Sequence, residues 1–96
     1  MVARKKSRRL EIEYCAQCRF ILRAAWMAEE LLMTFADELE EVALIPGTNG
    51  VFIVRLGGET LYSKAVSGHF PEMKTIKQQV RNKIAPDKDL GHSDRE

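Results

Sequence analysis

The regular pattern of the chain starts at Leu10, where apolar and acidic residues alternate through Tyr14. A period of two is typical of a strand with one buried face. From about Cys18 to Leu39 the apolar residues recur every three or four positions, which predicts a helix of about twenty residues. Its apolar band is wide because residues such as Trp26 lie off the main stripe. The Trp26 side chain could belong to the core or to an interface.

Three further strands are predicted by runs of apolar or β-branched residues, at positions 40–45, 51–56 and 59–64. The polar residues of the last run suit an edge strand. Pro46-Gly47-Thr48-Asn49-Gly50 is the strongest loop signal, and Gly57-Gly58 predicts a two-residue hairpin turn. After a connector, Pro71 opens a second helix, which Pro86 ends.

The order strand, helix, strand, strand, strand, helix predicts an α/β (α+β) domain built on a four-stranded mixed sheet. The first two strands, joined by a helix, should be parallel with a right-handed crossover. The hairpin then adds two antiparallel strands. We expect this domain to occupy residues 10–86, between a disordered basic arm at 1–9 and a flexible tail at 87–96.

Composition narrows the range of functions. The 96 residues have room for one domain, and a net charge of +1 argues against wholesale nucleic-acid binding, although residues 4–9 could touch nucleic acid. The chain contains no apolar run long enough to cross a bilayer, and its start lacks the apolar stretch of a secretory signal. We therefore expect a cytoplasmic protein.

Both cysteines lie in Tyr14-Cys15-Ala16-Gln17-Cys18-Arg19, where the first strand pattern ends and the first helix pattern begins. A two-residue gap at that point would bring the sulfur atoms within bonding distance in the first turn of a helix. Unpaired amides and the positive end of the helix dipole stabilise a thiolate there. In a reducing compartment such a pair is more typical of catalysis than of a structural disulfide. The spacing thus predicts a thiol–disulfide redox site at Cys15 and Cys18.

Other roles for the two cysteines compete with this one. A zinc site needs about four ligands, and the remaining candidates, His69 and His92, lie far along the chain, so no metal is predicted. Inert core cysteines are a second alternative. A structural disulfide is a third, but it would close so short a loop that it would restrain little chain.

The neighbours of the pair are the candidate supporting residues. Cys15 is expected to attack because it would lie nearer the exposed helix tip, although the choice between the cysteines stays open. Arg19 could stabilise a thiolate or could simply be solvated. His69 would reach the pair only if the connector before the last helix folds over it. The opposite wall of the site should come from the glycine-containing loop, where a peptide backbone can approach: Pro46, Gly47, Thr48, Asn49 and Gly50.

Four stretches together resemble the selenoprotein W-like, or Rdx, proteins of the thioredoxin-like fold, in their bacterial, cysteine-containing branch. They are Tyr14-Cys15-Ala16-Gln17-Cys18, residues 23–32, residues 46–52 and Ser67-Gly68-His69-Phe70-Pro71-Glu72. The resemblance covers residues 10–86 and implies a thioredoxin-like domain with the cysteine pair after the first strand. The last stretch adds Phe70, beside His69, to the substrate-facing candidates.

The same resemblance implies a selenol or thiol oxidoreductase with no bound cofactor, acting on protein thiols or using glutathione as a co-substrate. Cys15 matches the first cysteine of the family motif. Cys18 matches the position of selenocysteine in vertebrate members, which would favour Cys18 as the attacker. Thioredoxins carry a proline directly before the third strand, and Gly50 holds that place here, a departure that bears on how a substrate docks.

Two functions follow from these features. The first is a small thiol–disulfide oxidoreductase or redox sensor, in which one cysteine attacks a disulfide and the other resolves the mixed disulfide. The second is a non-enzymatic interaction module, in which the Trp26 face binds a partner and the cysteines only report the redox state. A homodimer is compatible with either function, and a membrane partner with neither.

Overall fold

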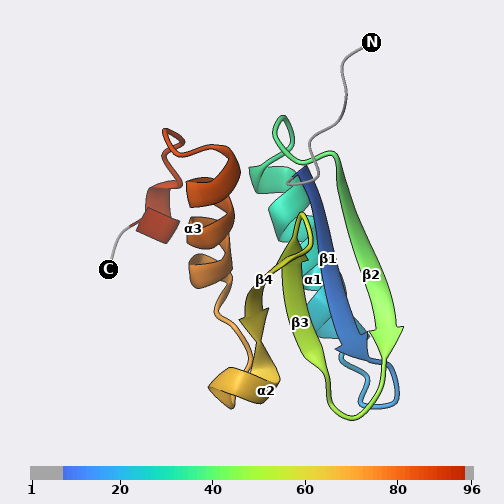
Figure 1. Ribbon diagram of the computed structural model, residues 1–96. Coiled ribbons are helices and arrows are strands. Elements are labelled where there is room, and N and C mark those ends of the chain that lie inside the picture. The colour runs from blue at the N-terminus through green and yellow to red at the C-terminus, as the bar shows by residue number, and fades with distance from the viewer. Residues whose placement is uncertain (1–7, 95–96) are drawn as a thin grey trace.

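The computed structural model describes residues 8–94, so most of the predicted basic arm lies outside it (Figure 1). The predicted order of strands and helices is confirmed, with a short helix and a 3-10 turn in addition. None of the helices within the described part is long and apolar enough to span a bilayer. The elements are β1 Arg9–Cys15, α1 Ile21–Thr34, β2 Glu41–Gly47, β3 Phe52–Leu56, β4 Glu59–Ser63, α2 Lys64–Ser67, α3 Met73–Ile84 and η2 Gly91–Asp94.

The four strands form one mixed sheet in the order β2-β1-β3-β4. β1 is parallel to β2 and antiparallel to β3, and β3 is antiparallel to β4, as predicted. β1 therefore has a hydrogen-bonded neighbour on each side, and α1 makes the crossover from β1 to β2. Figure 1 shows α1 running behind β1 and β3. The cysteine pair thus follows one of the two central strands of the sheet.

Side chains alternate along each strand, so one face of the sheet is buried and apolar. The other face carries charged residues among half-buried apolar ones such as Ile45 and Ile53. Leu10 and Ile12 of β1 are fully buried, and Ile12 lies opposite the buried Val54 of β3. The next residues point the other way: Glu13 accepts a hydrogen bond from Arg55 of β3 at 2.7 Å. The helices consequently cover one face only.

The two long helices contribute to the same buried cluster as β1 and β3. α1 buries Ala24, Ala28 and Leu31, and α3 buries Ile76 and Val80. Both apolar stripes are separated by three or four residues, which keeps them on one side of a helix. α1 is shorter than predicted at both ends, and its start, discussed below, matters for the cysteine site.

Residues 87–94, predicted to be a flexible tail, fold back against α3. Arg81 of α3 donates to the carbonyl of Lys88 at 2.9 Å and pairs with Asp94 at 2.8 Å. Leu90 packs against the core, and Lys88 lies 3.3 Å from the carboxylate of Glu38. The segment has no apolar period that could have revealed this docking, since its contacts are polar apart from Leu90.

The hairpin turn gives a direct test of the strand boundaries. Leu56 pairs with Glu59, and the two central residues, Gly57 and Gly58, have φ of 59° and 86°. β-branched residues rarely adopt this left-handed conformation, so valine at both positions should destabilise the fold by about 1–3 kcal/mol. Urea unfolding measures the difference. An unchanged midpoint would contradict a two-residue turn, and Thr60→Val on the exposed edge strand is the control.

The tail should make stability depend on pH. Hydrogen bonds from Arg81, and second from the Leu90 amide, hold the pKa of the Asp94 carboxyl below its ordinary value. Such a group stabilises the fold above its unfolded pKa, and the contribution disappears as the pH falls through the folded value. Asp94→Asn should thus lower the urea midpoint at neutral pH, and its difference from the parent should shrink below about pH 4. Asp87→Asn is the charge-matched control, and a pH-independent difference would argue against this contact.

Candidate redox site

The cysteine pair lies in a closed turn of its own. Cys15 ends β1, Cys18 follows in the turn, and the two are joined by a disulfide with their Cα atoms 5.3 Å apart. The Phe20 amide donates to the Cys15 carbonyl at 3.2 Å, and the Arg19 amide donates to the Ala16 carbonyl at 3.1 Å. Two such nested bonds form the Schellman motif, which ends helical turns.

This turn corrects the sequence-based picture of the site. The Schellman motif requires a residue in the left-handed region, and Arg19 supplies it with φ of 63°. The chain is therefore interrupted after Cys18, and α1 begins only at Ile21. The expectation that the pair occupies the first turn of the helix was wrong, and the helix dipole does not account for its chemistry.

The two sulfur-bearing residues differ sharply in access to solvent. Cys15 is 1% exposed, whereas Cys18 belongs to the exposed residues of the turn. Cys15 is buried because it still belongs to β1, and its amide donates to the Val51 carbonyl at 2.8 Å. The premise that Cys15 lies at an exposed tip was therefore wrong. An incoming molecule meets Cys18 first.

The β2–β3 loop holds the turn from the other side. The Ala16 amide donates to the Gly47 carbonyl at 3.2 Å, next to the bond between Cys15 and Val51. A Cβ on Gly47 would lie 2.7 Å from the Val51 side chain, so only glycine allows the loop to close this tightly. Pro46 and Gly47 belong to β2 rather than to the loop, which is a shift from the predicted boundary.

The rest of this loop is a tight reversal. The Val51 amide donates to the Thr48 carbonyl at 3.2 Å, and Asn49 and Gly50 have φ of 59° and 74°. Positive φ at both central residues is the signature of an Asn-Gly turn. The structure thus brings the whole predicted stretch, Pro46 to Gly50, to the end of the sheet where β1 enters the cysteine turn.

Three phenylalanine rings pack directly behind the turn. The Phe20 and Phe70 rings meet edge to face with their centroids 4.8 Å apart, and Phe52 lies 5.4 Å from Phe70. Phe70 was a predicted candidate, whereas Phe20 and Phe52 were missed because aromatic residues in a helix and a buried strand give no signal beyond core packing. This cluster joins the connector before α3 to the cysteine turn.

His69 does not itself reach the cysteine pair through a hydrogen bond. Its Nδ1 lies 2.9 Å from the Tyr62 hydroxyl and 2.9 Å from the Phe70 carbonyl, and the residue is exposed. Ser67 completes this group, since its hydroxyl donates to the Tyr62 oxygen at 2.6 Å. The imidazole therefore anchors the connector that carries Phe70.

Trp26 lies on the outer side of α1. It is 51% exposed, and Leu22 and Met33 on the same side of the helix are 76% and 67% exposed. Their spacing of four and seven residues places them on one stripe. Trp26 also lines a small hollow with Arg23 and Phe70, which connects the stripe to the aromatic cluster.

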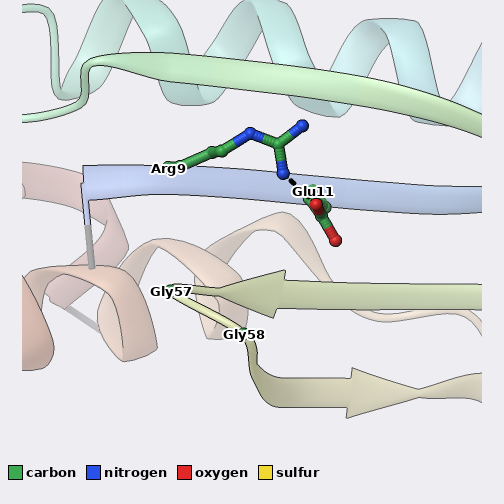
Figure 2. A pocket seen from close by; sticks show the side chains of 4 residues that line it. All are labelled: Arg9, Glu11, Gly57 and Gly58. Atoms are coloured by element: carbon green, nitrogen blue, oxygen red, sulfur yellow. Dashed lines mark hydrogen bonds and ion pairs between the residues drawn. The ribbon is translucent and has the colours of Figure 1, made fainter. Parts of the chain in front are cut away.

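A larger hollow of about 290 Å³ lies at the opposite end of β1, between Arg9, Glu11, Gly57 and Gly58. Figure 2 shows the Arg9 side chain reaching along β1 to the Glu11 carboxylate, with which it forms an ion pair. None of the predicted site residues lines this hollow. Within residues 8–94, no three His, Cys, Asp or Glu side chains come together as a group that could hold a metal ion.

Comparison with known proteins is consistent with this geometry. Residues 9–82 match the Rdx family over a segment that includes both cysteines, the β2–β3 loop and Phe70. The chain belongs to the Rdx family. The resemblance noted from the sequence is thereby confirmed for this Rdx protein.

Two crystal structures are similar to this Rdx protein. One is a protein from Bordetella parapertussis, 55% identical, with a TM-score of 0.76 over 78% of this chain and 95% of that one. The other is a selenoprotein W-related protein from Vibrio cholerae, 46% identical, with a TM-score of 0.75 over 77% and 92%. A search of curated proteins finds no match.

The turn predicts a stabilising substitution. A non-glycine residue in the left-handed region costs about 1–2 kcal/mol, and glycine's greater freedom in the unfolded chain offsets part of any gain. Arg19→Gly should accordingly raise the free energy of unfolding by roughly 0.5–1 kcal/mol. Gln17→Gly, in the same turn but without positive φ, should lower it. Equal effects of the two changes in urea unfolding would contradict the Schellman geometry.

Proposed function

We propose that this Rdx protein is a thiol–disulfide oxidoreductase in which Cys18 attacks and Cys15 resolves. The observation that carries the proposal is the unequal exposure of two cysteines held within bonding distance by a fixed turn. Attack requires an accessible thiolate, and resolution requires a second thiol that is close but shielded from solution. The exposure of Cys18 suits the first role, and the burial of Cys15 suits the second.

The reaction balances as two thiol–disulfide exchanges. In the reduced protein the Cys18 thiolate attacks one sulfur of a disulfide R–S–S–R, so a bond forms from Cys18 to that sulfur and the S–S bond of R–S–S–R breaks. The first R–S⁻ leaves and takes up a proton. Cys15 then gives up its proton and attacks the Cys18 sulfur, which forms the Cys15–Cys18 disulfide and releases the second R–S⁻. Counting the proton that Cys18 released when it ionised, the protein loses two electrons and two protons, and both R–S⁻ groups end as R–SH.

The partners of this reaction are protein thiols or glutathione, with glutathione as a co-substrate rather than a bound cofactor. Either can run the exchange in both directions, because the disulfide state of the protein is reduced by two equivalents of thiol. We place the reaction in the cytoplasm, where a lone cysteine pair is kept available for exchange.

Serine variants distinguish the two cysteines. Cys15→Ser keeps the exposed sulfur, so it should accumulate a mixed disulfide with glutathione when incubated with glutathione disulfide. Cys18→Ser keeps only the buried sulfur and should accumulate far less. Intact-mass spectrometry without reductant measures both, and the variant lacking both cysteines is the blank.

Two outcomes would contradict the proposal. More adduct on Cys18→Ser than on Cys15→Ser would make Cys15 the attacker. A parent protein that keeps two free thiols after air oxidation, with no loss of two protons that dithiothreitol reverses, would remove the redox function altogether. Circular dichroism of each variant shows whether the fold is retained.

The exposed stripe of Leu22, Trp26 and Met33 favours a second candidate function. Such apolar residues on one helix side are typical of an interaction surface, so the protein could be a module that binds a partner and reports its redox state. In the air-oxidation experiment, a protein that forms no reversible disulfide would be left with partner binding alone. Loss of partner binding in Trp26→Ala, with exchange intact, would show that both functions coexist.

A further inference from the structure

We propose that the surface around Cys18 selects disulfides that carry carboxylates beside their sulfur atoms. The inference rests on the proposed oxidoreductase function and deepens it by naming the charge class of the substrate. Three cations carry the argument: Arg19, Arg23 and Lys64.

All three cations lie at the cysteine end of the sheet. Arg19 directly follows Cys18, and Arg23 lies in the first turn of α1. Lys64 opens α2, and Figure 1 shows α2 at the same end of the sheet as the turn after β1. The Phe70 ring draws the last two together, since the Arg23 guanidinium lies 4.1 Å and the Lys64 ammonium 5.3 Å from its centroid.

These cations differ from most others in the described part of the chain, which are neutralised by acids. None of the ion pairs formed among residues 8–94 includes Arg19, Arg23 or Lys64. A net charge of +1 for the whole chain therefore hides a local excess of positive charge beside Cys18. The ion pairs elsewhere are Arg9–Glu11, Arg9–Glu41, Arg55–Glu11, Arg55–Glu13, Lys77–Glu30, Arg81–Asp94, Lys83–Glu59 and Lys88–Glu38.

The cations keep their hydrogen-bond donors available. A guanidinium that stacks over a ring is oriented by its face, and its N–H groups point outward in the plane, where they fit a carboxylate bidentately. The Arg23 guanidinium lies over the Phe70 ring, with its carbon 4.1 Å from the ring centroid. Of the acids near this end, Glu13 is bonded to Arg55, and Glu72 at the start of α3 is exposed. Three cations thus stand against one unpaired carboxylate.

Arg19 adds an argument from backbone strain. Its left-handed position is one that glycine occupies at lower cost. Strain retained next to a reactive group points from the observed outlier to a functional demand on the side chain. Here the side chain that occupies the strained position is a cation adjacent to the exposed cysteine.

In the exchange itself, the cations act on the encounter between Cys18 and the substrate. A carboxylate near the attacked sulfur contacts Arg23 or Lys64 while the Cys18–sulfur bond forms and the substrate S–S bond breaks. The electrons and protons balance as in the general reaction, with two of each passing from the protein to the substrate. Only the approach of the substrate depends on its charge.

The test uses three small disulfides of similar size: dithiodipropionate with two negative charges, the neutral hydroxyethyl disulfide, and the dication cystamine. The reduced protein is mixed with each, and acid-quenched mass spectrometry gives the rate of Cys15–Cys18 disulfide formation. Each rate is divided by that of the neutral dithiol dithiothreitol with the same probe, which removes the intrinsic reactivity of the disulfide. We expect the normalised rate to be highest with the dianion, intermediate with the neutral probe and lowest with the dication.

Variants locate the preference. Arg23→Gln and Lys64→Met should each lower the dianion-to-neutral rate ratio about two- to fivefold, the effect of one exposed charge–charge contact, and the double variant should lower it further. Arg23→Lys should retain most of the ratio because it keeps the charge. Lys83→Met is the matched control and should leave the ratio unchanged. It removes an exposed cation of α3 that is paired with Glu59 of β4.

Salt provides a check that does not depend on any variant folding. Added sodium chloride should slow the dianion and speed the dication relative to the neutral probe, because it screens exposed charges. Equal normalised rates for all three probes, or a preference for cystamine, would overturn the inference and leave the oxidoreductase function standing. No disulfide formation with any probe would overturn both. Glutathione disulfide is a fourth probe that distinguishes two sources of the carboxylates. A normalised rate above that of the neutral probe would indicate a small peptide disulfide as the substrate, and a rate no higher would indicate an acidic protein disulfide.

Discussion

The cysteine site depends on two backbone hydrogen bonds that tie the end of β1 to the β2–β3 loop. The Cys15 amide is bound to Val51 and the Ala16 amide to Gly47, so the first half of the turn continues the hydrogen bonding of the sheet. β1 is one of the two central strands of the sheet, with β2 on one side and β3 on the other, which fixes the start of the turn. The cysteine turn is thus tied to the sheet at Cys15 and Ala16, while Cys18 lies in its exposed part.

This one-sided support explains why the two cysteines differ in exposure. A residue that still belongs to a central strand is buried by the elements packed on that strand, as Cys15 is. A residue three positions later, beyond the last sheet bond, projects into solvent. The Schellman bonds then bring the chain back toward β1, so the two cysteines stay close while their access differs. The helix dipole is not required for any part of this arrangement.

The sequence predicted what depends on periodicity and strong local signals. The alternation from Leu10 to Tyr14, the Gly57-Gly58 turn and the order of elements all agree with the structure, because these patterns reflect a buried face or a forced backbone conformation. The start of α1 could not be predicted in the same way. A Schellman stop is usually marked by glycine, and Arg19 carries no such mark.

The wide apolar band of α1 concealed which side faces the core. The buried side includes Ala24, Ala28 and Leu31, while Leu32 is 43% exposed although it fits the same spacing. When apolar residues surround much of a helix, periodicity alone does not identify the covered side. The exposure of Trp26 therefore follows from the way the sheet and α3 pack on α1, which the periodicity of the helix does not reveal.

The charge around Cys18 is the property of the site that was hardest to predict from the sequence. Whether a cation is neutralised depends on contacts between distant positions: Lys77 meets Glu30, and Lys88 meets Glu38, across separations of 47 and 50 residues. Such ion pairs neutralise lysines of α3 and of the segment that follows it. What remains is concentrated where Phe20 and Phe70 hold Arg23 and Lys64 beside the cysteine turn, because an aromatic ring attracts a cation without cancelling its charge. Within the described residues, the fold thus gathers cations without acidic partners at the end of the sheet that carries the exposed Cys18.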